Sequence, residues 1–150
     1  MLSKITLILI FSTALLFTGC KNAEQQKENK QISVKIEAAL NQKNFNYLDL
    51  TKVSDKDWDK ICVIETYTPN EYVESKIGFK WNGLDGIDRI SGKFSLLLFI
   101  KNKTVIEYVQ HPRVKGDFLN ANIGCVPRDE ANFIVLDSSD NWKHLTLKHD

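Results

Sequence analysis

An almost wholly apolar segment of seven residues, Phe94 to Ile100 (FSLLLFI), limits most strongly how this chain can fold. A polar turn at 101–103 follows it, and then a second segment rich in apolar residues at 104–110 (TVIEYVQ). Together these segments predict a β-hairpin. Because the first segment is so apolar, we expect it to be a central strand of a sheet. At a sheet edge, its unpaired backbone would promote aggregation.

The apolar pattern elsewhere predicts two helices and several short strands around this hairpin. Ile32, Ile36 and Leu40 recur at helical spacing, which predicts a first helix over 32–42. Alternating or β-branched segments predict the other strands, at 45–53, 61–64, 124–126, 132–136 and 142–148. The expected fold class is α+β: a mainly antiparallel sheet of about five to six strands with two helices packed on it.

The second helix, expected over 69–77, has signals at both ends. Thr68-Pro69-Asn70-Glu71 has the form of a capping box with proline at the first helical position. Tyr67 and Tyr72 occupy the positions of a hydrophobic staple. Gly78 is placed to close the helix in a left-handed conformation. These signals are structural and indicate no chemistry.

The N-terminus carries one charge, Lys4, ahead of an uncharged stretch from Ile5 to Phe17. This composition is typical of a secretory signal peptide, which we expect over residues 1–19. The stretch is shorter than the roughly 18 apolar residues that a membrane-spanning helix requires. It therefore predicts export, and an ordinary secreted protein cleaved near Gly19 is one interpretation of it.

The end of this stretch, Phe17-Thr18-Gly19-Cys20, resembles the lipobox of bacterial lipoproteins. The resemblance implies cleavage before Cys20, acylation of that cysteine with chains such as palmitate, and anchoring to a membrane of the cell envelope. Two or three acyl chains would make the anchor effectively permanent. Lys21 and Asn22 follow the cysteine where an Asp would favour the inner membrane. The resemblance therefore implies the periplasmic face of the outer membrane in an organism with two membranes.

Residues 20–31 are expected to form the lipidated cysteine and a flexible tether, because no apolar side chain larger than Ala follows Cys20 there. Residues 32–150 have the size of a single domain. The chain has 20 Lys and Arg against 19 Asp and Glu, and losing Lys4 with the signal peptide leaves 19 of each. This balance argues against a nucleic-acid partner. No cofactor is expected.

Three cysteines are present, and acylation of Cys20 would leave the pair Cys62 and Cys125. In an oxidising compartment such a pair predicts a disulfide first. Two buried free thiols and a reactive Cys125 beside Arg128 are the alternatives.

Catalytic signals are weak. The chain contains no HExxH, GxSxG or SxxK motif. His111 ends a predicted strand beside Arg113, with Asp117 nearby. An enzyme hypothesis would therefore be a cell-envelope hydrolase that uses His111 with Cys125 or nearby carboxylates. His144 lies within a predicted strand and is a weaker candidate.

Two groups of acidic residues resemble sites of known types. Asp57, Asp59 and Glu65 invite comparison with paired glycosidase carboxylates, although charged residues at strand ends usually form a solvated rim. The loop 82–88 contains Asn82, Asp85 and Asp88, but its spacing does not match an EF-hand. No metal is expected there.

Four aromatic residues cluster within one span of 24 residues: Trp58, Tyr67, Tyr72 and Trp81. Tyr and Trp are enriched where proteins bind each other, so any that are exposed predict a partner-binding surface. The segment from Trp58-Asp59-Lys60 to Tyr67-Thr68-Pro69 resembles one shared by small uncharacterised bacterial lipoproteins, which implies no activity. We therefore expect a noncatalytic binding lipoprotein of the immunity, inhibitor or assembly type, whose partner is another envelope protein.

Overall fold

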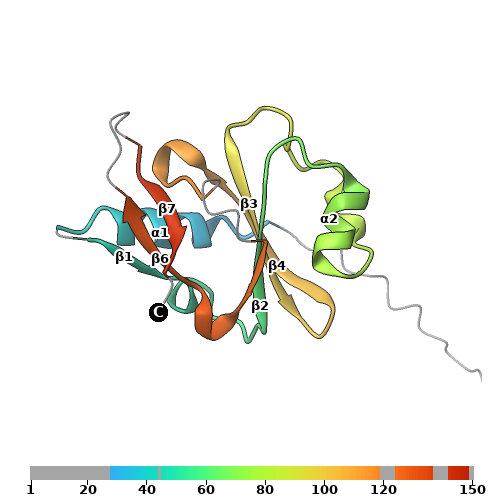
Figure 1. The fold of residues 1–150 in the computed structure, drawn as a ribbon, viewed down its shortest axis with the longest axis horizontal. Coiled ribbons are helices and arrows are strands. Elements are labelled where there is room, and N and C mark those ends of the chain that lie inside the picture. The colour runs from blue at the N-terminus through green and yellow to red at the C-terminus, as the bar shows by residue number, and fades with distance from the viewer. Residues whose placement is uncertain (1–27, 44, 119–123, 137–141, 149–150) are drawn as a thin grey trace, which may run out of the picture.

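A computed structural model describes residues 28–43, 45–118, 124–136 and 142–148 (Figure 1). The predicted signal peptide and Cys20 lie outside these residues. Within them, none of the helices has the length and apolar character needed to cross a bilayer.

The predicted hairpin is confirmed and lies within a four-stranded antiparallel sheet. Its strands are β3 (Phe94–Lys101) and β4 (Thr104–Pro112), and the sheet order is β4-β3-β2-β5, with β2 at Lys60–Ile64 and β5 at Cys125–Pro127. Strand β3 is central, as its composition predicts, and its residues 95–100 are all buried. Asn102 and Lys103 both have positive φ angles, 47° and 57°. This is the backbone of a two-residue turn whose twist matches that of the strands.

A second sheet corrects the expectation of a single sheet with five to six strands. Strands β1 (Tyr47–Asp49), β6 (Asn132–Leu136) and β7 (His144–Leu147) pair antiparallel in the order β1-β6-β7. The described residues thus contain seven strands in two sheets. The predicted strand over 45–53 is shorter because the Asp49 carboxylate accepts a hydrogen bond from the Thr51 amide at 2.9 Å. That bond starts a 3₁₀ turn at Leu50–Lys52.

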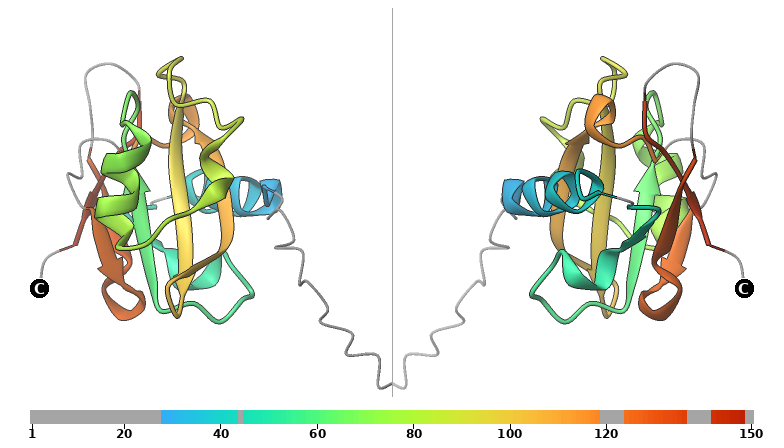
Figure 2. Two further views of the ribbon diagram at one scale, coloured as in Figure 1. Left: turned by 90° about the vertical axis from the view of Figure 1, so that its right-hand side faces the viewer. Right: turned by 90° about the vertical axis from the view of Figure 1, so that its left-hand side faces the viewer.

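The two helices cover opposite faces of the four-stranded sheet (Figure 2). Helix α1 (Lys30–Leu40) buries Ile32, Ile36 and Leu40 in a core that also contains residues of the three-stranded sheet. Helix α2 (Asn70–Ile77) buries Val73 and Ile77 against the other face. Successive residues of β2 and β3 alternate between these two cores, which accounts for the continuous burial of β3.

The end of α2 is as predicted, but its beginning is not. Gly78 is left-handed, with φ 89°. Pro69 is the N-cap and makes no side-chain cap, so the predicted capping box is wrong. The Thr68 hydroxyl instead donates to the Glu65 carbonyl at 2.7 Å. Tyr67 and Tyr72 are largely exposed and form no buried staple.

The segment just before α1 is attached to the edge of β4. The Asn29 amide donates to the Tyr108 carbonyl at 2.9 Å, and the Gln110 amide donates to the Glu28 carboxylate at 3.1 Å. The Asn29 side chain also donates to the buried carboxylate of Glu107. The folded domain therefore includes residues 28–31, which the sequence assigned to the tether.

Candidate functional site

Tyr67 is an exposed aromatic residue on an unusual backbone. It follows β2 with φ 62°, in the left-handed region that non-glycine residues seldom adopt, and its side chain is 68 % exposed. Its amide donates to the Arg89 carbonyl at 2.6 Å. Because the exposed ring adds little packing, neighbouring hydrogen bonds must hold the backbone in this conformation.

Arg89 supplies those neighbouring bonds. Its guanidinium donates to the carbonyl of Thr68 and to the side-chain oxygen of Asn70. The segment 67–70 is thereby fixed against the segment that precedes β3. Two parts of the chain about 20 residues apart thus form one rigid end of the sheet.

The loop after Arg89 presents a second apolar side chain, Ile90, which is 78 % exposed. The Asp88 carboxylate accepts from the amides of Ile90 and Ser91, at 3.2 and 2.9 Å, in an Asx turn. The hydrogen bonds from Ser91 lower the pKa of Asp88 below its ordinary value. The Asp88 amide donates to the Gln110 side chain at 2.8 Å, which ties this loop to β4.

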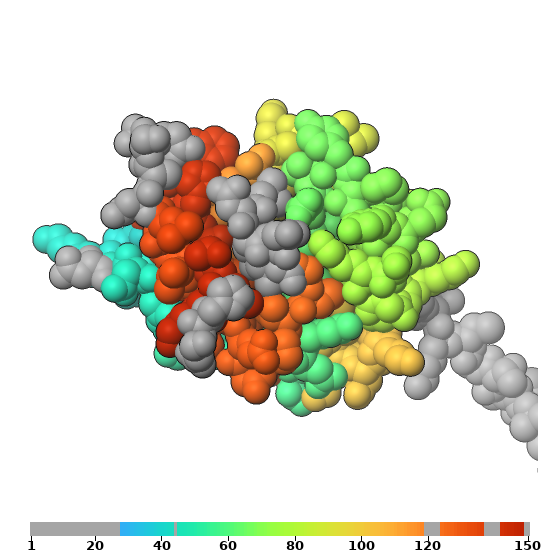
Figure 3. Space-filling model, in the orientation of Figure 1, coloured from blue at the N-terminus to red at the C-terminus, as the bar shows by residue number. Residues whose placement is uncertain are grey.

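Tyr72 extends the same end of the molecule onto α2. Its side chain is 60 % exposed, and the Lys76 ammonium lies 5.8 Å from the ring centroid. We call Tyr67, Tyr72 and Ile90 the tyrosine surface. In the space-filling view, the segments that carry them adjoin at the end of the molecule formed by α2 and the loop before β3 (Figure 3).

The other two aromatics of the predicted partner-binding set are core residues. Trp58 is 1 % exposed and packs edge-on against Phe99, with ring centroids 5.3 Å apart. Trp81 is half-buried, packs edge-on against Tyr108 and covers Gly83 so closely that a Cβ there would lie 2.4 Å from its ring. Burial corrects the expectation for Trp58 and leaves Trp81 little surface for a partner.

His111 is fully buried beneath α1. Its Nδ1 lies 2.9 Å from the Ser33 hydroxyl, and its Nε2 is buried without a hydrogen bond of standard geometry. Burial lowers the pKa of His111 to about 4, while the charge of Glu37 and the backbone of Lys115 act weakly in the opposite direction. A neutral, inaccessible imidazole is suited to packing rather than to exchanging protons with a substrate.

The predicted disulfide is confirmed: Cys62 and Cys125 are bonded across β2 and β5. Cys125 is therefore not a free thiol, and the disulfide lies on the α2 side of the sheet whereas His111 lies on the α1 side. The arrangement required for a hydrolase using His111 and Cys125 does not exist in this structure.

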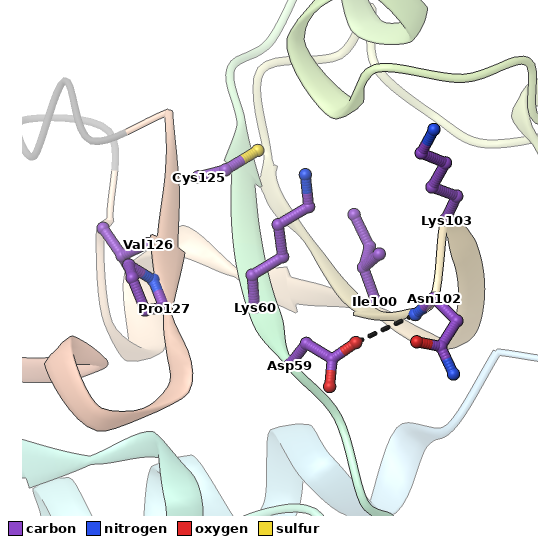
Figure 4. A pocket seen from close by; sticks show the side chains of 8 residues that line it. All are labelled: Asp59, Lys60, Ile100, Asn102, Lys103, Cys125, Val126 and Pro127. Carbon is purple, nitrogen blue, oxygen red and sulfur yellow. Dashed lines mark hydrogen bonds between the residues drawn. The ribbon is translucent and has the colours of Figure 1, made fainter.

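A groove opens beside the disulfide, at the end of the sheet where β3 turns into β4 (Figure 4). Its volume is about 470 Å³. Asp59 lies at its edge and accepts from the Asn102 amide at 2.9 Å; this hydrogen bond, with Lys101, lowers the pKa of Asp59. The residues that line the groove come from β2 and the residue before it, from β3 and β5, and from the hairpin turn: Asp59, Lys60, Ile100, Asn102, Lys103, Cys125, Val126 and Pro127.

Two of the acidic residues compared with glycosidase carboxylates, Asp57 and Asp59, form ion pairs. Asp57 and Asp59 both pair with the Lys101 ammonium, at 2.6 and 3.3 Å, which is the solvated rim rather than a carboxylate pair across a sugar cleft. Within the described ranges, no group of three or more His, Cys, Asp or Glu residues is arranged to hold a metal ion.

A charged cluster that the sequence did not predict joins the two sheets. Arg113 binds the buried Asp117 carboxylate through two nitrogens, at 3.1 and 2.8 Å. His144 Nδ1 lies 3.7 Å from the same carboxylate, and Trp142 lies under the Arg113 guanidinium, 5.5 Å from it. In the sequence, only Arg113 and Asp117 of this cluster lie near each other, since Trp142 and His144 follow more than 20 residues later. The cluster connects the end of β4 to β7.

No family model, curated protein or solved structure matches this chain.

Proposed function

We propose that this protein is a lipid-anchored, noncatalytic binding protein of the bacterial cell envelope, and that its tyrosine surface binds another protein. Anchoring rests on the resemblance of residues 17–20 to a lipobox. The immunity, inhibitor and assembly lipoproteins are the functional types that fit a small displayed domain of this kind.

The observation that carries the proposal is the way Tyr67 is presented. A left-handed backbone costs about 1–2 kcal/mol for a residue with a Cβ. Tyr67 adopts this conformation although its side chain is 68 % exposed, and three hydrogen bonds involving Arg89 maintain the conformation. Strain retained at an exposed aromatic residue is typical of a functional contact.

The composition of the surface suits a protein partner. Tyr residues frequently dominate binding energies, because the ring buries a large area with few rotatable bonds and the hydroxyl remains able to hydrogen bond. Ile90 adds an aliphatic side chain that is 78 % exposed. Rigid aromatic and aliphatic groups bind with a small loss of conformational entropy.

The test is to incorporate a photo-crosslinking phenylalanine analogue in place of Tyr67 in the full chain, irradiate intact cells, and identify the adduct. Tyr47, 39 % exposed on the three-stranded sheet, provides the matched control position. We expect one predominant protein adduct from position 67 and not from 47. The adduct should be lost in Ile90→Ala and retained in Val34→Ala, a change at an exposed residue of α1.

The same adducts from positions 47 and 67, or none from position 67, would overturn the tyrosine surface as a binding site. Mass spectrometry of the purified protein tests the anchor separately. A mature N-terminus at an acylated Cys20 is expected, and an unmodified chain cleaved at Gly19 would contradict it.

A further inference from the structure

The two cysteines of the disulfide differ in their access to solvent. Cys62 is 0 % exposed, within the core beneath α2. Cys125 is partly exposed and lines the groove. In thiol–disulfide exchange, a thiolate attacks one sulfur and expels the other. Access therefore directs an incoming thiolate to Cys125 and makes Cys62 the leaving group.

Lys60 places a positive charge on the side of the expected leaving group. Lys60 and Cys62 are two residues apart on β2, so their side chains lie on the same face of the strand. The Lys60 ammonium donates to the Ile77 carbonyl at 3.1 Å, and Ile77 belongs to the same core cluster as Cys62. A neighbouring cation stabilises a thiolate.

The groove can also accommodate the group that carries the attacking thiol. Ile100, Val126 and Pro127 line it with apolar surface, and Lys103 lies at its rim (Figure 4). Strand β5 is an edge strand of three residues, and Pro127 lacks the amide that would continue a ladder of hydrogen bonds. The approach to Cys125 is therefore not closed by another strand of this sheet.

We infer that, beyond the noncatalytic binding proposed above, the Cys62–Cys125 disulfide is a thiol–disulfide exchange site that reacts once per molecule, and that its substrate is a thiol entering through this groove. The substrate thiolate forms a bond with Sγ of Cys125 while the bond between the two protein sulfurs breaks. The electron pair of that bond leaves with Cys62, which takes a proton from water. A second thiol on a dithiol substrate then displaces Cys125, leaving the substrate oxidised to a disulfide and both protein cysteines reduced.

The experiment uses the full chain with Cys20→Ala, so that Cys62 and Cys125 are its only cysteines. The folded protein is treated with glutathione or with a ten-residue peptide containing one cysteine and quenched with acid, and free thiols are then alkylated in denaturant. Peptide mapping locates both modifications. We expect the mixed disulfide on Cys125 and the alkyl group on Cys62.

Either of two results would overturn the inference: adducts on Cys62 as often as on Cys125, or no adduct until denaturant is added. The two thiols distinguish the source of the substrate. If the peptide reacts with a larger rate constant per thiolate than glutathione does, the substrate is a protein cysteine. If the two rate constants are equal, the substrate is a small thiol. Both results support an exchange site.

Substitution of Lys60 tests the assigned role of its charge. In Lys60→Met the rate constant for exchange should fall about fivefold, because one positive charge beside the leaving sulfur is lost. Lys60→Arg should restore it, and Lys103→Met, at the rim of the same groove, should leave it within about twofold of wild type. Equal rates in Lys60→Met and wild type would contradict this role. If Lys60→Met does not fold, adduct mapping on the Cys20→Ala chain still tests whether Cys125 is the exchange site, because that experiment leaves Lys60 unchanged.

Discussion

The hydroxyl of Ser33 lies 2.9 Å from Nδ1 of His111, and this hydrogen bond joins helix α1 to the end of strand β4. The imidazole is fully buried, and Phe118 packs edge-on against it with ring centroids 5.8 Å apart. His111, which the sequence suggested as a catalytic residue, is thus part of the packed interior. Its burial mainly affects the stability of the domain at acid pH.

His111 should make the domain less stable at low pH. Its pKa is about 4 in the folded protein and 6.5 in an ordinary environment, so the unfolded chain binds the proton more tightly. The associated stability is complete above pH 6.5 and is lost as the pH falls towards 4. The free energy of unfolding should fall by about 2 kcal/mol between pH 7 and pH 5 from this group. Urea denaturation at both pH values measures it.

His111→Gln is the control for that measurement, because glutamine can still hydrogen bond to Ser33 but does not titrate. The difference between the two pH values should shrink by about the same 2 kcal/mol in this variant. An unchanged difference would mean that other groups cause the acid sensitivity.

Removing the disulfide should destabilise the domain without abolishing its fold. Cys62 and Cys125 are 63 residues apart, and closing a loop of that length is worth about 4 kcal/mol in the chain-entropy model. Cys62→Ala/Cys125→Ala should lower the free energy of unfolding by about that amount in urea. Cys20→Ala, outside the described residues, should not change it. A loss below about 1 kcal/mol would show that the loop is already restricted in the unfolded chain.

Tyr67→Gly should separate stability from binding. Glycine adopts the left-handed conformation without a Cβ penalty, so this change should raise the free energy of unfolding by about 1 kcal/mol. It should also weaken partner binding, because the ring is lost. Tyr67→Ala should lose binding without the gain in stability. Thermal denaturation measures the change in stability, and a pull-down of the partner identified by crosslinking measures the change in binding. A glycine variant less stable than the alanine variant would show that the backbone at Tyr67 is not strained.

Asp117→Asn should be strongly destabilising. The Asp117 side chain is 1 % exposed and neutralises Arg113, so the change leaves a partly buried guanidinium without its carboxylate. Breaking a buried pair in this way costs about 3–5 kcal/mol. Asp55→Asn is the matched control, because the Lys35–Asp55 pair is exposed and should be worth less than about 1 kcal/mol. Similar losses in the two variants would argue against the cluster as the link between the sheets.

Local sequence patterns predicted the elements of this fold well. The β-branched run in β2, the apolar segment in β3 and Gly78 after α2 are each determined by neighbouring residues. The disulfide followed from the cysteine count and the expected compartment. The strands and the helix end depend on neighbouring residues, and the disulfide depends on there being only one pair of cysteines to join, so a single sequence contains enough information for them.

The division into two sheets depends on contacts that no local pattern specifies. Strand β6 pairs with β1, about 85 residues away, after a 3₁₀ turn at Arg128–Glu130 separates it from β5. The alternation of apolar residues in β6 is compatible with pairing in either sheet. The sequence therefore predicted the strands but not their partners.

The binding surface was predicted only in part, for a similar reason. Trp58 and Tyr67 lie on either side of the same strand, β2, yet one is in the core and the other is exposed. Arg89 fixes the segment of Tyr67 through hydrogen bonds between residues about 20 positions apart, and Trp58 packs against Phe99, 41 positions away. The contact between Asp117 and His144 of β7 likewise joins residues 27 positions apart in the sequence.

The disulfide also determines how the molecule would respond to a mechanical load. Tension applied to the two ends of the chain would pass covalently from β2 to β5, bypassing 63 peptide steps that contain α2 and the β3–β4 hairpin. At about 3.6 Å for each extended residue, roughly 230 Å of chain would be withheld from extension. Reduction would release that length, so the oxidation state of one bond sets how far this protein can be stretched.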